Sequence, residues 1–257
     1  MKSKKLLFPI IFLSFFFLFA CSEEDNPTEP NDTGNGNATT NNSGQPIPSM
    51  AQSGDGVLAT ISYEFQTAAG FPPVGIIMGF AQFGGGIDAG NVTVNGNALG
   101  KTTQSGTTFY VTPSPSNPTQ SLSGVNFDGS NHNWEVSGSG DVPQISGSVA
   151  SPTNFSVSSP ANNSTVSKAN GVNVNWNNTS SNSRVLVVLA QLDNSGNYYS
   201  ADVDDNGSHT IAAADISGFS GQSMLQVVKY NYASASAGGK TYYMVSEIVK
   251  SVTITVN

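Results

Sequence analysis

Apolar and polar residues alternate along much of the chain after residue 50. The run from Val57 to Phe65 places an apolar side chain at every odd position and mostly polar side chains between them. A period of two is typical of a β-strand with one buried face. No stretch keeps a helical period, so the pattern predicts an all-β protein. Further strand-like runs lie at 92–94, 109–111, 134–136, 172–176, 185–192, 225–230, 242–245 and 251–256.

Turn residues separate these runs. Asn95-Gly96 follows the run at 92–94, and this dipeptide favours the positive φ angles of a two-residue hairpin turn. The rhythm of short strands and turns predicts two β-sandwich domains in tandem. We expect a sandwich or jelly-roll-like domain over 51–150 and a second sandwich over 151–257.

The first twenty residues have a different pattern. Three lysines precede an apolar run over 6–20, which is shorter than the roughly 20 residues of a membrane-spanning helix. Residues 1–20 therefore predict a cleaved signal peptide. The run ends Leu-Phe-Ala-Cys at 18–21, which resembles the lipobox of bacterial lipoproteins, and Cys21 is the only cysteine in the chain. The resemblance implies that Cys21 becomes the first mature residue and carries the lipid that anchors the protein to a membrane.

A polar segment follows the cysteine. The sequence Ser-Glu-Glu-Asp at 22–25 resembles the surface-export signal of lipoproteins from Bacteroidota, which implies display on the outside of the outer membrane. Residues 21–50 contain only Ile47 and Met50 as sizeable apolar groups. Such a segment buries too little apolar surface to offset the entropy cost of ordering. We therefore expect a lipidated cysteine followed by a disordered linker.

The charge of the chain limits its partners. Charged residues make up 10% of the chain, and the formal net charge is −8. Removal of Lys2, Lys4 and Lys5 with the signal peptide leaves six basic and 17 acidic residues, a formal charge of −11. Nucleic acids and anionic lipid headgroups both require a basic patch. The sequence therefore predicts no nucleic-acid partner and a membrane link through the lipid on Cys21.

The C-terminal half carries a second resemblance. A proline-led strand at Ser159-Pro160 precedes a strand that ends in Trp176. This segment resembles the first strands of fibronectin type III domains and of bacterial Ig-like domains. The resemblance implies an Ig-like sandwich over 151–257, without the cysteine pair of antibody domains. This fold serves many roles, so it implies no function by itself.

The residues that could support catalysis are few. His132 and His209 are the only histidines, and the sequences around both predict loops or turns. No Gly-x-Ser-x-Gly motif accompanies the many serines. Glu64, Glu135 and Glu247 alternate with apolar neighbours, so we expect them to face solvent. The sequence therefore predicts a non-enzymatic protein.

One acidic segment matches a metal-binding pattern. Residues 202–207 read Asp-Val-Asp-Asp-Asn-Gly, like the opening of an EF-hand loop, in which Ca²⁺ takes several oxygen ligands at this spacing. Asp202, Asp204 and Asn206 are therefore candidate calcium ligands. The twelfth position is Ala213 instead of the glutamate that completes such a loop. An Asp-rich β-turn is the alternative, and no other cofactor is predicted.

Aromatic residues supply the candidate ligand contacts. Trp134 and Trp176 alternate with valines and are predicted to lie in the core. Adjacent residues on a strand point to opposite faces, so one tyrosine of each adjacent pair should face outward. An outward row of tyrosines would suit a glycan or a protein ligand, although cross-strand tyrosine pairs also stabilise sheets. The candidate ligand-binding residues are Tyr198, Tyr199, Tyr230, Tyr232, Tyr242 and Tyr243.

These features predict an outer-membrane-anchored surface lipoprotein. Its expected role is a non-enzymatic binding or adhesion module for a glycan or an extracellular protein. One alternative is a structural or envelope-assembly lipoprotein that faces the periplasm, and another is an accessory protein of secreted glycoside hydrolases. A glycan binder should present coplanar exposed aromatic rings, whereas a hydrolase should present two acids about 5–10 Å apart.

Overall fold

The computed structural model describes residues 54–65, 74–114, 120, 122–193 and 195–257. The regular elements in these ranges are strands, apart from the 3₁₀ turn η2 (Lys168–Asn170), so the all-β prediction is confirmed. None of the described segments forms a helix that is long and apolar enough to cross a membrane. The predicted signal peptide, Cys21 and the linker lie outside the described residues.

The strands are named in chain order. They are β1 (Gly56–Phe65), β2 (Val74–Phe83), β3 (Val92–Val94), β4 (Asn97–Ala98), β5 (Gly100–Gln104), β6 (Thr107–Thr112), β7 (Asn131–Val136), β8 (Ile145–Ala150), β9 (Val157–Ser159), β10 (Ser164–Val166), β11 (Val172–Trp176), β12 (Arg184–Gln191), β13 (Tyr198–Asp204), β14 (Ser208–Ile211), β15 (Gly221–Ala237) and β16 (Lys240–Val256).

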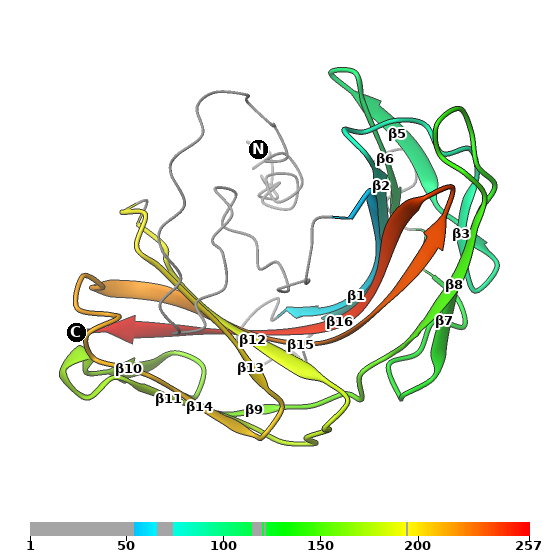
Figure 1. Cartoon of the computed structure of the whole chain (residues 1–257). Helices are drawn as coiled ribbons and strands as arrows, with labels where there is room; N and C mark the ends of the chain where they lie inside the picture. Colours follow the sequence, from blue (N-terminus) through cyan, green and yellow to red (C-terminus); the bar gives the residue numbers. More distant parts are fainter. Residues whose placement is uncertain (1–53, 66–73, 115–119, 121, 194) are drawn as a thin grey trace, which may run out of the picture.

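One large curved sheet dominates the described structure. Its strand order is β13-β12-β15-β16-β1-β2-β6-β5, and β10 also pairs with β16. Two smaller sheets lie on the convex face of this sheet (Figure 1). The sheet β14-β11-β9 packs on one end, and the sheet β4-β3-β7-β8 packs on the other. Each smaller sheet encloses a separate hydrophobic core against the large one.

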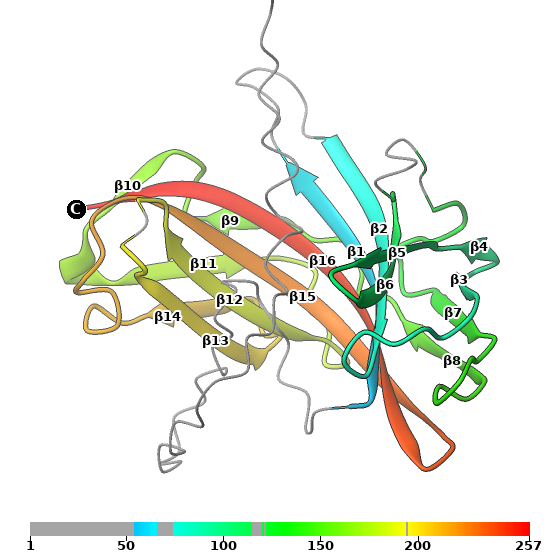
Figure 2. The ribbon, with the colours of Figure 1, turned by 90° about the horizontal axis from the view of Figure 1, so that it is seen from above.

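The hairpin of β15 and β16 connects the two ends. These strands pair along their whole length, from Gly221 opposite Val256 to Ala237 opposite Lys240. Figure 2 shows them running from one small sheet to the other. The predicted boundary after residue 150 falls between β8 and β9, but the large sheet continues across both halves. The sequence hid this continuity because each long strand contains stretches of small or polar residues that divide its apolar pattern.

The two cores confirm the predicted positions of the tryptophans. Trp134 on β7 is 1% exposed and lies in the first core, whereas Trp176 on β11 is 5% exposed and lies in the second. The predicted turn is also present, because Asn95 and Gly96 have φ angles of 46° and 77° and join β3 to β4. Local sequence patterns therefore identified both cores and one of the hairpins.

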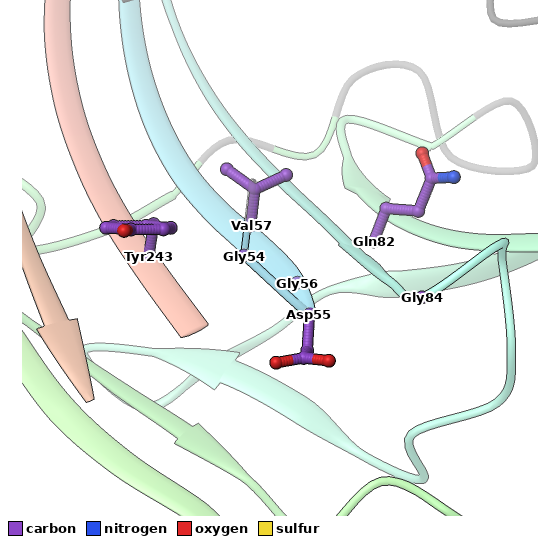
Figure 3. Close-up of a pocket in the computed structure, with 7 residues that line it drawn as sticks. All are labelled: Gly54, Asp55, Gly56, Val57, Gln82, Gly84 and Tyr243. Atoms are coloured by element: carbon purple, nitrogen blue, oxygen red, sulfur yellow. The ribbon is translucent and has the colours of Figure 1, made fainter. Parts of the chain in front are cut away.

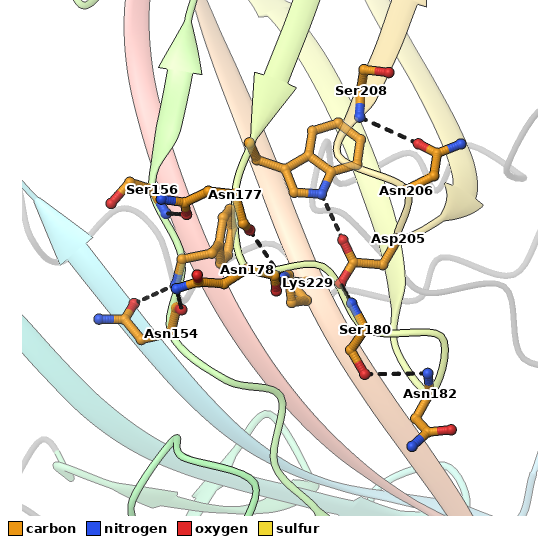
Figure 4. Close-up of polar contacts among 12 residues, drawn as sticks. Asn154, Ser156, Asn177, Asn178, Ser180, Asn182, Asp205, Asn206, Ser208 and Lys229 are labelled. Carbon is orange, nitrogen blue, oxygen red and sulfur yellow. Dashed lines mark hydrogen bonds and ion pairs between the residues drawn. The ribbon is translucent and has the colours of Figure 1, made fainter.

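A fully buried ion pair stabilises the second half (Figure 4). The Nζ atom of Lys229 on β15 lies 3.0 Å from Oδ2 of Asp205, and both side chains are 0% exposed. The carboxylate also accepts hydrogen bonds from Trp176 Nε1 at 2.6 Å and from the Ser180 backbone N–H at 2.9 Å. The ammonium also donates to the Asn178 carbonyl oxygen. A buried pair is tolerated when further hydrogen bonds satisfy both charges, as they do here.

We predict that the two cores unfold together because they share β15 and β16. Leu58→Ala empties space in the first core and should cost about 2–5 kcal/mol of unfolding free energy. In a Trp134→Phe background, Trp176 fluorescence reports on the second core alone. The urea midpoint of this signal should fall when Leu58→Ala is added. An unchanged Trp176 midpoint would show that the halves unfold independently.

We also predict a large cost for removing one partner of the buried pair. Lys229→Met leaves the Asp205 carboxylate without its counter-charge and should lower the unfolding free energy by about 3–5 kcal/mol. Lys101→Met is the matched control, because it breaks an exposed pair with Asp88 and should cost less than about 1 kcal/mol. Urea denaturation followed by circular dichroism measures both variants. Equal costs would contradict the assigned role of the buried pair.

Candidate functional site

The concave face of the large sheet carries a third hydrophobic cluster. Neither small sheet contributes to this cluster, because its members all come from β1, β12, β13, β15 and β16. None of the strands in the described ranges forms a second layer over this face, and an apolar sheet face of this kind is a candidate binding surface. The buried members are Ala59, Leu186, Val188, Val228, Tyr230, Val245 and Val249, and the half-buried ones are Val57, Ile61, Tyr63 and Tyr198.

Three tyrosines form a row on this face. The rings of Tyr230 and Tyr232 stack with centroids 6.5 Å apart and an interplanar angle of 27°. The Tyr232 ring also meets the Tyr243 ring edge-on, at 6.3 Å and 63°. Tyr232 is 42% exposed, whereas Tyr230 and Tyr243 are buried. The structure therefore brings three of the six predicted tyrosines together around one exposed ring.

The other predicted tyrosines do not join this row. Tyr198 packs at the margin of the concave cluster. Its neighbour Tyr199 packs instead against the second core, where its hydroxyl lies 2.6 Å from His209 Nε2. Tyr242 belongs to the first core. The members of both adjacent pairs thus lie on opposite faces of the sheet.

Beside the row, Tyr230 is tied to an ionic network. Its hydroxyl donates to Asp202 Oδ2 at 2.6 Å, and Arg184 Nε donates to Asp202 Oδ1 at 2.9 Å. Burial and the Asp202 carboxylate both raise the pKa of Tyr230. Arg184 Nη1 also donates to Asp204 Oδ1 at 2.7 Å. One guanidinium therefore bridges two of the candidate calcium ligands.

The geometry around residues 202–206 differs from a calcium loop. Asp202 and Asp204 lie on β13 instead of in a loop, and Asn206 Oδ1 accepts a hydrogen bond from the Ser208 backbone N–H at 3.2 Å. Within the described ranges, no group of three or more His, Cys, Asp or Glu side chains converges on a metal position. The acidic segment instead supplies carboxylates to Arg184 and Lys229.

Glu247 lies in the middle of the concave cluster. It is opposite Tyr230 on β15 and opposite Ile61 on β1. No other residue of the described chain forms a hydrogen bond or an ion pair with its carboxyl group, and burial raises its pKa to about 7. The expectation that Glu247 faces solvent holds only in part, because its side chain is half-buried among the apolar side chains of this face. The sequence contained a signal for this, since Val245 and Val249 occupy the positions two residues away on the same face.

A pocket of about 210 Å³ opens at the start of β1 (Figure 3). Tyr243 and Val57 line it from neighbouring strands, and Asp55 lies at its edge. A side chain at Gly54 would meet the Tyr243 ring, because its Cβ would lie 2.6 Å from a ring carbon. Glycine at this position therefore allows the chain to pass close to the ring. The pocket adjoins the tyrosine row through Tyr243.

The histidines occupy structural positions. His132 was predicted in a loop but lies on β7 with 0% exposure. Its Nε2 lies 2.9 Å from the Asn126 carbonyl oxygen, which can only accept, so Nε2 carries the proton and Nδ1 accepts from Thr60 Oγ1 at 2.6 Å. Burial lowers the pKa of His132. The prediction for His209 was also wrong, because it lies on β14.

The predicted acids do not form a catalytic pair. Glu64 pairs with Lys250, Glu135 is exposed on β7 of a small sheet, and Glu247 lies on the concave face. These carboxyl groups therefore belong to three different surfaces.

No family model, curated protein or solved structure matches this chain. The functional interpretation of the concave face therefore rests on the geometry of its own residues.

We predict that Glu247→Gln stabilises the protein at alkaline pH. Burial raises the pKa of Glu247 from 4.5 to about 7, so the folded state binds more protons than the unfolded state between these values. The contribution of Glu247 to the unfolding free energy is therefore fully present below pH 4.5, where the group is protonated in both states. This contribution is lost as the pH rises to about 7. Glu247→Gln should recover up to about 3 kcal/mol at pH 8 and almost nothing at pH 4, as urea denaturation would measure. Glu135→Gln, at an exposed position, is the control. A loss of stability at pH 8 would contradict this account.

Proposed function

We propose that this protein is an outer-membrane-anchored surface lipoprotein that acts as a non-enzymatic binding module. Its binding surface is the concave face of the large sheet. The observation that carries this proposal is the combination on one face of an apolar cluster, an exposed tyrosine and a carboxyl group that has no partner among the described residues. Such a surface offers a ligand both contact area and directional contacts.

Several observations support binding over catalysis. Thr60 and Ser246, the hydroxyl side chains nearest to His132, are fully buried with it, so a substrate has no access to them. The carboxylates of Asp205 and Glu64 are engaged by lysines. The burial and the ion pairs of these groups are therefore explained by structural roles.

The proposed anchor and domain type rest on the sequence. The lipobox-like sequence at 18–21 supports lipidation of Cys21, and the acidic cluster at 22–25 supports export to the cell surface. The arrangement of β14-β11-β9 against β13-β12-β15-β16 is compatible with an Ig-like or fibronectin type III-like sandwich. We retain that resemblance as a proposal.

The exposure of the aromatic rings favours a ligand with an apolar body over a flat sugar ring. Stacking on a sugar needs exposed coplanar rings, but Tyr232 is the exposed member of the tyrosine row, and the ring of Tyr243 is inclined to it by 63°. The neighbouring face is formed by aliphatic side chains. Apolar contacts would therefore supply most of the binding free energy.

We predict that Cys21→Ser abolishes lipidation and releases the protein from the membrane fraction. Protease treatment of intact cells should cleave the wild-type protein, because the proposal places residues 54–257 outside the cell. Immunoblotting of cell fractions measures both results, and an intact periplasmic protein serves as the leakage control. Membrane attachment that survives Cys21→Ser would contradict the lipid anchor. Full protection until lysis would favour a periplasm-facing structural role.

A further inference from the structure

We infer that the concave face contains a binding site for an organic cation, formed by Tyr232, Tyr243 and Glu247 around the short side chains of Val245 and Ala59. The ligand class is an alkylated or primary ammonium group attached to a small apolar body. This inference rests on the proposed function, because it names the ligand chemistry of the proposed binding surface.

The strand register places these residues around one point. Val245 on β16 is opposite Tyr232 on β15 and opposite Ala59 on β1. Tyr243 and Glu247 lie two residues before and after Val245, so they share its face of the sheet and their Cα atoms are roughly 13 Å apart. The side chains between them are small and buried. The register therefore groups the three larger side chains around Val245 and Ala59.

The two tyrosine rings supply attraction for a cation. The negative face of an aromatic ring attracts ammonium groups, and several rings around one ammonium form an aromatic cage. The planes of Tyr232 and Tyr243 are inclined by 63°, so the rings form two sides of a corner instead of a flat stack. With 42% exposure, Tyr232 is accessible to a ligand from solvent. Tyr243 extends the site to the pocket beside Val57, where an apolar body can lie.

Glu247 supplies the charge on the third side. The charged and titratable groups that face it are Tyr230 on β15, Tyr63 on β1 and, beyond Tyr230, Asp202 and Arg184. The guanidinium of Arg184 is engaged by two aspartates, and Tyr230 donates its hydroxyl to Asp202. The carboxyl group of Glu247 therefore has no counter-charge within the described chain, and a bound ammonium group would provide one.

Burial of this carboxyl group gives the site a pH dependence. The pKa of Glu247 is raised to about 7, so the free protein carries the charge mainly above that value. A bound cation favours the ionised form and lowers this pKa. Affinity for the cation should therefore increase as the pH rises from 6 to 8.

Other ligand charges fit this site poorly. An anion would meet the carboxylate of Glu247 and the formal charge of −11 that remains after signal cleavage. The same negative charge raises the local concentration of cations. A neutral apolar ligand would leave the carboxylate desolvated and unpaired, which opposes binding.

The experiment compares two probes of equal shape. Choline carries a trimethylammonium group, and 3,3-dimethylbutan-1-ol replaces its nitrogen with carbon and has no charge. Saturation-transfer NMR on the full-length lipoprotein in phosphatidylglycerol nanodiscs avoids competing choline headgroups. We expect choline to bind at least about tenfold more tightly than the alcohol at pH 8. Because the pKa is about 7, the affinity at pH 6 should be about tenfold lower than at pH 8.

Three variants assign the effect to the site. Glu247→Gln should reduce choline affinity at pH 8 by about tenfold and remove the pH dependence, and Tyr232→Ala should reduce affinity at both pH values. Glu135→Gln removes one exposed carboxylate from a small sheet and should change neither property. Both variants should fold, because Tyr232 is exposed and Glu247→Gln is expected to stabilise the protein. Circular dichroism verifies this.

Each outcome has a defined meaning. Equal binding of choline and the alcohol overturns the inference, as does a Glu247→Gln protein that binds choline like the wild type. Equal losses in Glu247→Gln and Glu135→Gln also overturn it, because they indicate attraction by the overall charge. If the protein is lipidated and protease-accessible but does not prefer choline, the inference of a cation site is overturned and the proposed surface location stands. If the protein binds choline but is protected from protease in intact cells, the proposed surface location is overturned and the cation site stands.

Discussion

The pairing of β15 with β16 is the interaction on which the rest of the structure depends. The 17 residues of β15 pair with the 17 of β16 in one continuous register. β12 pairs with β15, while β1 and β10 pair with successive stretches of β16. Because side chains alternate between faces, this one register places Val227 and Ile248 in the second core and Tyr230 and Glu247 on the concave face. A slip by one residue would exchange these faces, so the cores and the candidate site depend on the same register.

The parts of the fold that depend on local sequence could be predicted, and the parts that depend on distant contacts could not. The strand at 57–65 and the turn at Asn95-Gly96 are encoded by neighbouring residues, so both were identified correctly. The more deeply buried face of that strand was not, because Leu58 and Thr60 on its other face are fully buried. The parallel pairing of β1 with β16 joins residues 186 positions apart, and no local pattern encodes it. His132 was placed in a loop because Asn, Ser and Gly surround it, but its hydrogen bond to Thr60 and its burial under the large sheet outweigh that propensity.

The surroundings of two acids show how the concave face differs from the cores. Asp205 is fully buried and receives an ammonium group, an indole N–H and a backbone N–H. Glu247 is surrounded by apolar side chains and receives none of these within the described chain. The same protein therefore satisfies a buried charge where the charge is structural. Function is expected at sites where a protein gives up local stability. The sequence did not single out Glu247, because its alternation with apolar neighbours is typical of a solvent-facing strand residue.

The parallel contact between β1 and β16 also sets the order in which the protein can be completed. β1 is among the first strands to be synthesised, whereas its partner β16 is the last one described. Until β16 emerges from the ribosome, β1 can pair only with β2, and neither core can close because both include residues of β16. Closure of both cores during translation is therefore postponed until β16 has been synthesised. A chain built in this way can complete neither core for as long as β16 is withheld.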